Sequence, residues 1–183
     1  MRAGDAAAFT SLYELHYDDV LRYARRRVDE QTARDVAAET FLVAWRRPGL
    51  VPNAEPLPWL YAVARNTLGN VLRARARDAA LGVRVRTAPV AGVPMVQADH
   101  ADAVVQSAQV TQALRRLSSR DQEALQLVAW EDLDLAAAAQ VVGCSAATFA
   151  VRLHRARRRL GRLLDAPAPK PGSKFPVLET EAR

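Results

Sequence analysis

Apolar residues recur with the period of an α-helix in the first part of the chain. In the range Ala33–Trp45, small or apolar residues stand at i, i+3, i+4, i+7, i+8, i+11 and i+12. Similar stripes run over Phe9–Val28 and Trp59–Leu72. A period of about 3.6 residues places one apolar face on each helix. The pattern predicts three helices of an all-α fold, the second ending near Arg47 before a proline-rich loop, Pro48–Pro58.

The pattern dissolves between Asp78 and Gln106, where small residues are interrupted by glycine and proline. This stretch is too long and too poor in large apolar residues for an ordinary connection inside one compact domain. We therefore expect two small helical domains, residues 1–77 and 107–165, joined by a flexible linker over 78–106. The last segment, 166–183, is rich in proline and has little to bury, which indicates a disordered tail.

The second domain carries the spacing of a helix-turn-helix. Ser119 is expected to cap a helix that runs through Glu131. A short apolar helix then begins at Leu135 and stops at Gly143, a residue able to adopt the positive φ of a helix C-terminus. Ser145 follows as a candidate N-cap of the next helix.

That next helix has one apolar stripe and one arginine stripe. The apolar stripe is expected to face a core and consists of Phe149, Leu153, Ala156, Leu160 and Leu163/Leu164. The opposite side presents Arg152, Arg155, Arg158, Arg159 and Arg162. A helix of this kind behind a tight turn is typical of a reader of the DNA major groove. Duplex DNA is therefore the first partner that the residues themselves indicate.

Charge and composition narrow the class further. The 183 residues carry a net charge of +6 and one cysteine. The basic residues are clustered, which favours nucleic acid over a diffuse acidic partner. A single cysteine excludes an internal disulfide and fits a reducing compartment. The start of the chain lacks an apolar core long enough for a signal peptide, and no apolar run reaches the length of a membrane span, so we expect a soluble cytoplasmic protein without membrane insertion.

Catalytic and metal-binding patterns are not found in the sequence. His16, His100 and His154 stand on different predicted elements, and Cys144 falls at the helix-turn-helix bend, where a small core residue is expected. The sequence has no HExxH, paired CxxC or glycine-rich phosphate loop. We therefore expect a protein that is not an enzyme and that needs no cofactor or metal.

Four segments, taken in order, resemble the extracytoplasmic-function (ECF) group of bacterial RNA polymerase sigma factors. They are FTSLYELHYDDVLRYARRRV, ARDVAAETFLVAWRR, PWLYAVARNTL and LRRLSSRDQEALQLVAWEDLDLAAAAQVVGCSAATFAVRLHRARRRL. The resemblance covers about residues 5–77 and 107–164. It implies two helical domains, called region 2 and region 4, joined by a flexible linker. It also implies core RNA polymerase and promoter DNA as partners, and an anti-sigma factor as a further partner.

The resemblance assigns roles to three groups of residues. The face that would dock on core polymerase consists of Asp35, Glu39, Leu42 and Arg46, with an ordinary solvated helix face as the alternative. The residues that would hold the single-stranded −10 element are Asn53, Tyr61, Arg65, Asn66 and Asn70, whereas Trp59 is expected to anchor its helix in the core. The residues near the −35 duplex are Ser145, Thr148, Ala150, Val151, Arg152, His154, Arg155 and Arg158. Several of Arg157–Arg162 are alternatively solvated or in contact with polymerase.

Four positions depart from the family pattern. Ala136 and Ala137 stand where acidic residues are usual, and Ala150 and Val151 stand where the recognition helix usually carries a basic and a small polar residue. The resemblance therefore implies the mode of DNA binding more than the base sequence that is read. The main alternative is a dimeric helix-turn-helix regulator that binds duplex DNA without joining polymerase. A hydrolase or transferase would need a polar pocket that the sequence does not supply.

Overall fold

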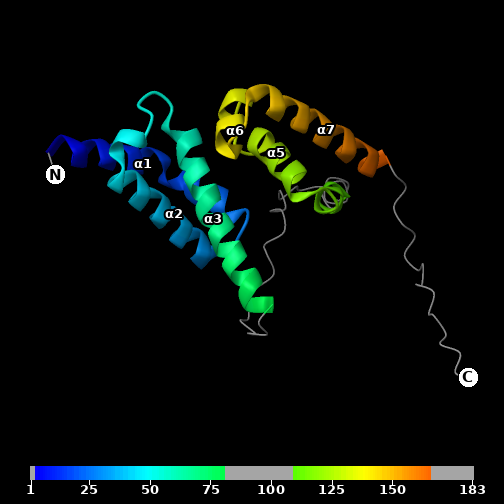
Figure 1. The fold of residues 1–183 in the computed structure, drawn as a ribbon, viewed down its shortest axis with the longest axis horizontal. Helices are drawn as coiled ribbons and strands as arrows, with labels where there is room; N and C mark the ends of the chain where they lie inside the picture. Colours follow the sequence, from blue (N-terminus) through cyan, green and yellow to red (C-terminus); the bar gives the residue numbers. More distant parts are fainter. Residues whose placement is uncertain (1–2, 81–108, 166–183) are drawn as a thin grey trace, which may run out of the picture.

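The computed structural model describes residues 3–80 and 109–165, and within these ranges every regular element is helical. The first half contains helices α1 (Ala3–Arg25), α2 (Glu30–Arg46) and α3 (Pro56–Ala80), with a short 3₁₀ turn, η1 (Pro48–Leu50), after α2. Figure 1 shows α1, α2 and α3 packed as one group. The predicted all-α class is confirmed. The predicted tail and residues 81–106 of the predicted linker lie outside the described residues.

The helices of the first half begin and end where local chemistry dictates. Asp29 is the N-cap of α2, and its carboxylate accepts a hydrogen bond from the Thr32 amide at 3.0 Å. Helix α3 begins at Pro56, since proline in a first turn gives up no intrahelical hydrogen bond. The loop predicted over Pro48–Pro58 is therefore shorter than expected. Helix α3 also continues to Ala80, so residues 78–80, predicted as linker, are helical.

The helices of the second half also begin at capping residues, and one of these caps differs by one position from the prediction. Residues 109–115 are helical, followed by α5 (Ser119–Ala129), α6 (Leu135–Val142) and α7 (Ala146–Asp165). The N-cap of α5 is Ser118 rather than the predicted Ser119, because the Ser118 hydroxyl accepts the hydrogen bond from the Asp121 amide. Helix α5 ends at Ala129, two residues before the predicted Glu131.

The helix-turn-helix bend follows the prediction closely. Gly143 closes α6 with φ of 72°, the left-handed conformation that glycine adopts at low cost. The Ser145 hydroxyl accepts a hydrogen bond from the Thr148 amide at 3.2 Å, as the N-cap prediction requires. Cys144 lies between them, half-buried against the core.

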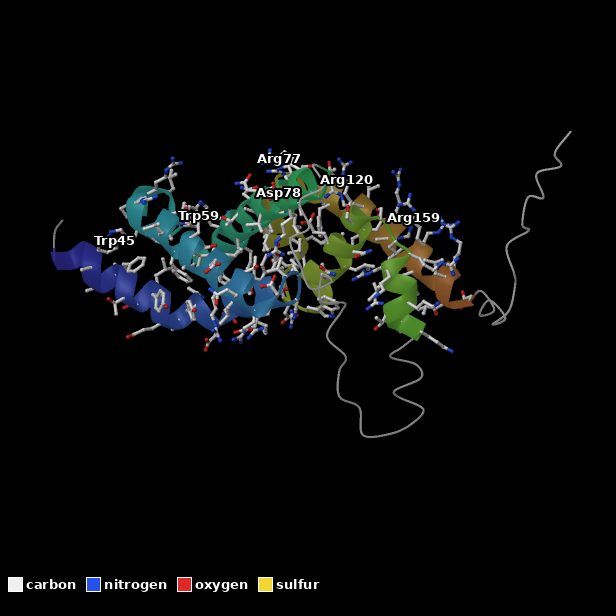
Figure 2. The ribbon with its side chains drawn as sticks, turned by 90° about the horizontal axis from the view of Figure 1, so that it is seen from below. Trp45, Trp59, Arg77, Asp78, Arg120 and Arg159 are labelled. Carbon is white, nitrogen blue, oxygen red and sulfur yellow. The ribbon has the colours of Figure 1, made fainter. Side chains whose placement is uncertain are left out.

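The two halves pack against each other. Helix α3 contacts α6, and the buried apolar residues of both halves form one continuous cluster. The cluster runs from Val20 and Phe41 in the first half to Leu127 and Phe149 in the second. Figure 2 views both halves with their side chains and shows Arg77, Arg120 and Arg159 along one side of the molecule. The hydrophobic periodicity of the sequence did not predict this packing, because it reports on each helix separately.

Candidate nucleic-acid interface

Helix α7 is fixed to α5 and α6 by its apolar stripe. Phe149, Leu153 and Ala156 are buried, which confirms the centre of the predicted stripe. Farther along, Leu160 and Leu163 are half-buried and Leu164 is 42% exposed. The first three turns of α7 are therefore packed most tightly, and its last turns are only partly covered.

The opposite side of α7 is open to solvent. Among the residues predicted to meet the −35 duplex, those that are exposed are Ser145, Thr148, Val151, His154, Arg155 and Arg158. Ala150 and Arg152 are half-buried. The hydroxyls of Ser145 and Thr148 lie 2.9 Å apart and close the helix N-terminus, so their first role is capping. The face can thus offer arginine side chains and apolar Val151 to a groove.

An open hollow of about 460 Å³ lies beside this face, between α5 and α7. Its arginines are Arg120 from α5 and Arg152, Arg155 and Arg159 from α7. The exposed guanidinium groups of Arg120 and Arg155 suit a phosphate backbone. Arg120 was missed from the sequence because it belongs to a helix before the helix-turn-helix and forms no periodic stripe with α7.

Arg159 differs from its neighbours on α7. Its Nη1 lies 2.5 Å from Oδ2 of Asp121, whose side chain is 6% exposed. This carboxylate belongs to the first turn of α5, so the ion pair ties the C-terminal half of α7 to α5. Arg159 is thus committed to a contact inside the domain, unlike Arg155 and Arg158.

Only some of the residues predicted to hold the −10 strand are exposed. Asn66 and Asn70 are exposed on α3, and Asn53 is exposed in the preceding loop. Arg65 is half-buried, and its guanidinium donates to both carboxylate oxygens of Glu123 on α5, at 2.6 and 3.1 Å. These hydrogen bonds with Glu123 raise the pKa of Arg65.

Tyr61 corrects one prediction. It is 1% exposed and stacks on Tyr23 of α1, with ring centroids 4.8 Å apart. Burial raises the pKa of Tyr61 well above its ordinary value. The side chain lies on the core side of α3, one position after buried Leu60, and cannot meet a nucleic acid in this conformation. Trp59 is half-buried against the same core, in line with an anchoring role.

The loop before α3 borders a largely apolar hollow of about 500 Å³. Phe9 of α1, Trp45 of α2 and Pro52 of the loop are among its lining residues, and Asn53 adds a polar amide. Phe9 and Trp45 meet edge to face, with centroids 4.8 Å apart. An apolar, aromatic hollow with one amide has the chemistry to hold an unstacked base.

The predicted polymerase-docking residues, Asp35, Glu39, Leu42 and Arg46, are all exposed on α2. Leu42 is 37% exposed and lies beside a groove that contains Tyr13, Tyr17 and Trp45. The exposed leucine is therefore part of a wider aromatic surface rather than an isolated apolar residue. Protein interfaces commonly have an apolar and aromatic centre that is surrounded by charged residues.

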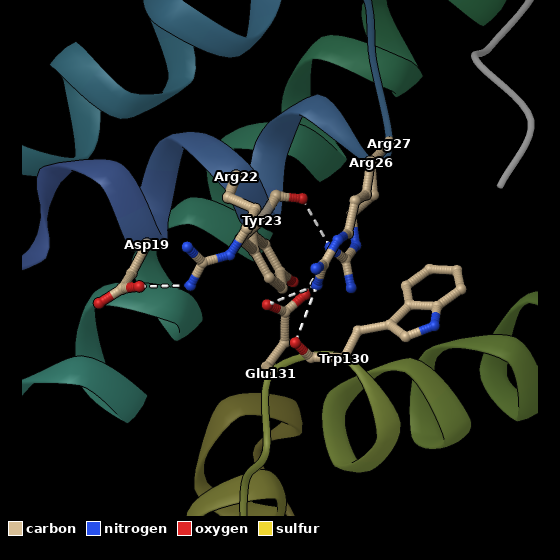
Figure 3. A network of polar contacts seen from close by, with 7 residues as sticks. All are labelled: Asp19, Arg22, Tyr23, Arg26, Arg27, Trp130 and Glu131. Atoms are coloured by element: carbon tan, nitrogen blue, oxygen red, sulfur yellow. Dashed lines mark hydrogen bonds and ion pairs between the residues drawn. The ribbon is translucent and has the colours of Figure 1, made fainter. Parts of the chain in front are cut away.

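A polar network also joins the two halves (Figure 3). Glu131, just beyond α5, has a side chain that is 0% exposed, and it lies 3.0 Å from Nη1 of Arg26 and 3.4 Å from Nη1 of Arg27. Both arginines follow the end of α1, and Arg26 also donates to the Trp130 carbonyl at 3.0 Å. The sequence shows the arginine run, but nothing in it pairs that run with a glutamate 104 positions away.

Two further features concern metal ligands and membrane-spanning helices. Within residues 3–80 and 109–165, no three histidine, cysteine or acidic side chains are grouped as metal ligands would be. In the same ranges, no single helix is long and apolar enough to cross a membrane. Only α6 and α7 taken together pass that test, and they are bent by 97°.

A helix-turn-helix with an arginine-bearing second helix defines a DNA-binding protein, and comparison with known families defines the class. A model for Sigma-70 region 2 matches residues 12–78, and one for Sigma-70, region 4 matches residues 107–160. The ECF RNA polymerase sigma factor SigL of Mycobacterium tuberculosis is 32% identical over 162 residues, covering 86% of this chain and 89% of the relative. The chain belongs to the ECF family of RNA polymerase sigma factors.

A second relative and a solved structure are also similar to this chain. The ECF RNA polymerase sigma factor BldN of Streptomyces coelicolor is 32% identical over 169 residues, covering 89% of this chain and 62% of that relative, so the chain spans less than two thirds of its length. The sigma factor RpoE from Bartonella quintana, solved in complex with the anti-sigma factor NepR, shares the fold with a TM-score of 0.63 at 24% identity. That match covers 86% of this chain and 96% of the other.

Proposed function

We propose that this chain directs core RNA polymerase to promoters, with α2 docking on the polymerase, α7 reading the −35 duplex, and the α3 face with its preceding loop holding the −10 strand. The observation that carries the proposal is the presence, in order on one chain, of a region 2 domain and a region 4 domain whose α7 exposes Arg155 and Arg158. A protein that only bound duplex DNA would need the second domain alone.

The −35 contact rests on the chemistry of α7. An arginine that reaches into the major groove can donate two hydrogen bonds to guanine. Arginines that lie beside the groove contact phosphates instead. Val151, 50% exposed, can contact a thymine methyl group. Arg120 and Arg152 line the hollow beside α7, and their guanidinium groups would hold the phosphate backbone. This combination fits a contact with few polar base readers and many phosphate contacts.

The −10 contact rests on a hollow and a polar helix face. The apolar hollow bordered by Asn53 suits one base turned out of the stack. Asn66 and Asn70 are exposed along α3 and can donate and accept hydrogen bonds with a neighbouring strand. Arg65 belongs to the same face once it leaves Glu123. Tyr61 has no place in this contact because it is buried.

Polymerase docking rests on the exposed side of α2. Asp35, Glu39 and Arg46 supply charges that orient a partner, and Leu42 supplies an apolar centre next to an aromatic groove. The protein would act without chemistry of its own, in the cytoplasm where core polymerase is found. An anti-sigma protein is a further proposed partner, by analogy with the complex of the Bartonella quintana relative.

Binding to core polymerase and strand opening test this function together. The tagged full-length chain should retain core polymerase on a column, and the holoenzyme should make thymines near the −10 element reactive to permanganate. A variant with residues 52–55 replaced by Gly-Ser-Gly-Ser should retain polymerase and duplex DNA but lose the reactivity. A chain that binds promoter duplex and never retains polymerase would support the dimeric regulator instead.

A further inference from the structure

The hollow beside the loop before α3 has a wall that is mostly apolar. Helix α1 contributes Phe9, Leu12 and Leu15 to this wall, and the loop contributes proline and valine side chains. Trp45 of α2 adds an aromatic ring whose indole nitrogen can only donate a hydrogen bond. Any of the bases would gain from stacking and contact with such a wall. The apolar side chains can therefore hold a base but give little preference among bases.

Among the described residues that line this hollow, two have side chains that can both donate and accept hydrogen bonds. One is Asn53, which is exposed in the loop. The other is His16 of α1, whose side chain is 20% exposed. A neutral imidazole has one donor and one acceptor nitrogen, and a primary amide has groups of both kinds. Since bases differ in the donors and acceptors along their edges, these two side chains can distinguish one base from another.

The imidazole of His16 is not committed to a contact inside the fold. Its Nδ1 is buried and has no hydrogen-bond partner within residues 3–80 and 109–165. Oδ2 of Asp19 lies 3.9 Å from Nδ1, which is too far for a hydrogen bond, and the Asp19 carboxylate already accepts one from Arg22. A buried polar atom without a partner is uncommon in folded proteins and calls for a functional or structural reason. No hydrogen bond at Nδ1 holds the ring in one tautomer, so the ring can adopt the tautomer that a bound base requires.

We propose that His16 is a specificity-determining residue of the −10 contact: its imidazole, together with the Asn53 amide, hydrogen-bonds the edge of the base held in the hollow. This inference rests on the proposed function, because it concerns the base that the hollow is proposed to hold. It adds α1 to a contact that the proposed function assigns to α3 and the loop before it. A base with the wrong edge would leave polar atoms of the site unpaired, and unpaired polar atoms give strong discrimination.

The test measures how the holoenzyme, formed from core polymerase and the full-length chain, binds single strands that carry the −10 element of a mapped promoter. Each position of the element is changed in turn to the other bases. The wild type should prefer one base at the position that enters the hollow. His16→Leu removes both ring nitrogens and keeps an apolar side chain, so it should lower this preference about tenfold. The preferences at the other positions should stay as they are.

A strand that lacks the base at that position completes a double-mutant cycle. His16→Leu should leave the affinity for this abasic strand as it is in the wild type, because the proposed contact needs a base. Glu14→Leu places the same side chain at an exposed position of α1 that does not line the hollow. This matched control should keep the full preference. His16→Gln retains a donor and an acceptor, so its preference should lie between those of the wild type and His16→Leu.

An unchanged preference in His16→Leu overturns the inference. An equal loss of affinity for all strands, the abasic strand included, also overturns it, because His16 would then support the hollow without recognising the base. If thermal unfolding shows that His16→Leu does not fold, His16→Gln decides, and a full preference in that variant overturns the inference. A wild-type holoenzyme that does not bind these strands contradicts the proposed −10 contact itself. The failure of the proposed function is thus distinguished from the failure of this inference.

Discussion

Arg159 of α7 forms an ion pair with Asp121 of α5, with 2.5 Å between Nη1 and Oδ2. Asp121 is almost fully buried, while Arg159 is half-exposed. The main role of this arginine is therefore to neutralise the buried carboxylate. The ion pair joins α7 to α5 at the point where the apolar residues of α7 become only half-buried. In the sequence, Arg152 and Arg159 have the same place on the arginine stripe of α7. The ion pair distinguishes them, because Arg159 is paired inside region 4.

Substitution of Arg152 or Arg159 by alanine should therefore give different results. Arg152→Ala should reduce promoter-specific transcription, and for a phosphate contact the slope of log affinity against log salt should fall by about one. Arg159→Ala should lower the unfolding free energy by about 1 kcal/mol, because Asp121 loses its partner, with a smaller effect on DNA binding. Filter binding over a salt series and thermal unfolding measure the two effects. Equal losses of transcription in both variants would contradict the assignment.

Two glycines of region 4 should respond to alanine in opposite directions. Gly143→Ala should lower the unfolding free energy by about 1 kcal/mol, because φ of 72° is strained for any residue with a Cβ. Gly161→Ala, in the interior of α7, where the added Cβ meets no other part of the fold within 4 Å beyond its own stretch of helix, should raise it by about 0.5–1 kcal/mol. Urea unfolding of both variants checks the pair. If Gly143→Ala were as stable as the wild type, the helix-turn-helix bend described here would be wrong.

Asp29 should make stability depend on pH in the acid range. The hydrogen bonds from Thr32 lower the pKa of Asp29 from 3.8 to about 2. A lowered folded-state pKa stabilises the fold above the unfolded value, and this contribution is lost as pH falls from about 4 through 2. The side chain is 39% exposed, so solvent screening keeps the effect small and the direction is the prediction.

Asp29→Asn provides the matched comparison for that titration. Asparagine caps a helix about as well as aspartate, so the variant should stay within about 0.5 kcal/mol of the wild type at neutral pH. It should lose the part of the acid dependence that comes from Asp29. Urea unfolding at a series of pH values from 5 to 2 measures this. Parallel curves for the two proteins would show that Asp29 does not titrate as described.

Charge reversal on α2 tests the docking face. Asp35→Lys and Glu39→Lys should each weaken binding to core polymerase, because exposed charges at a rim steer and orient the partner. The effect should be strongest at low salt, where screening is weakest. Asp165→Lys, an exposed reversal at the end of α7, is the control and should leave the affinity as it is. Surface-bound core polymerase and a titration of each variant give the affinities, and equal affinity for all proteins would remove α2 from the interface.

The sequence predicted the helices well because each has its own apolar stripe and its own stop signals. Gly143 and Ser145 mark the bend by local chemistry alone, and the structure confirms both. The beginning of α3 was misplaced because Pro56 and Pro58 read equally well as a loop or as a first helical turn. Local signals of this kind fix an element more firmly than its boundary.

Contacts between distant segments could not be predicted in the same way. The pairing of Glu131 with Arg26 and Arg27, and of Arg65 with Glu123, depends on how the two halves pack. Tyr61 is predicted as a DNA contact because it lies in a segment, PWLYAVARNTL, that resembles the family. The structure instead turns it toward Tyr23 in the core. The apolar pattern of one helix does not say which of its side chains the other helices will cover.

In vitro transcription on fragmented genomic DNA tests the central claim most directly. Core polymerase with this chain should start RNA at discrete positions that share one −35 and one −10 element. With Arg152→Ala the same positions should be used less often. Core polymerase alone should start at none of them preferentially. If addition of the chain left the distribution of start sites as it is with core polymerase alone, the chain would not act as a promoter-specificity subunit.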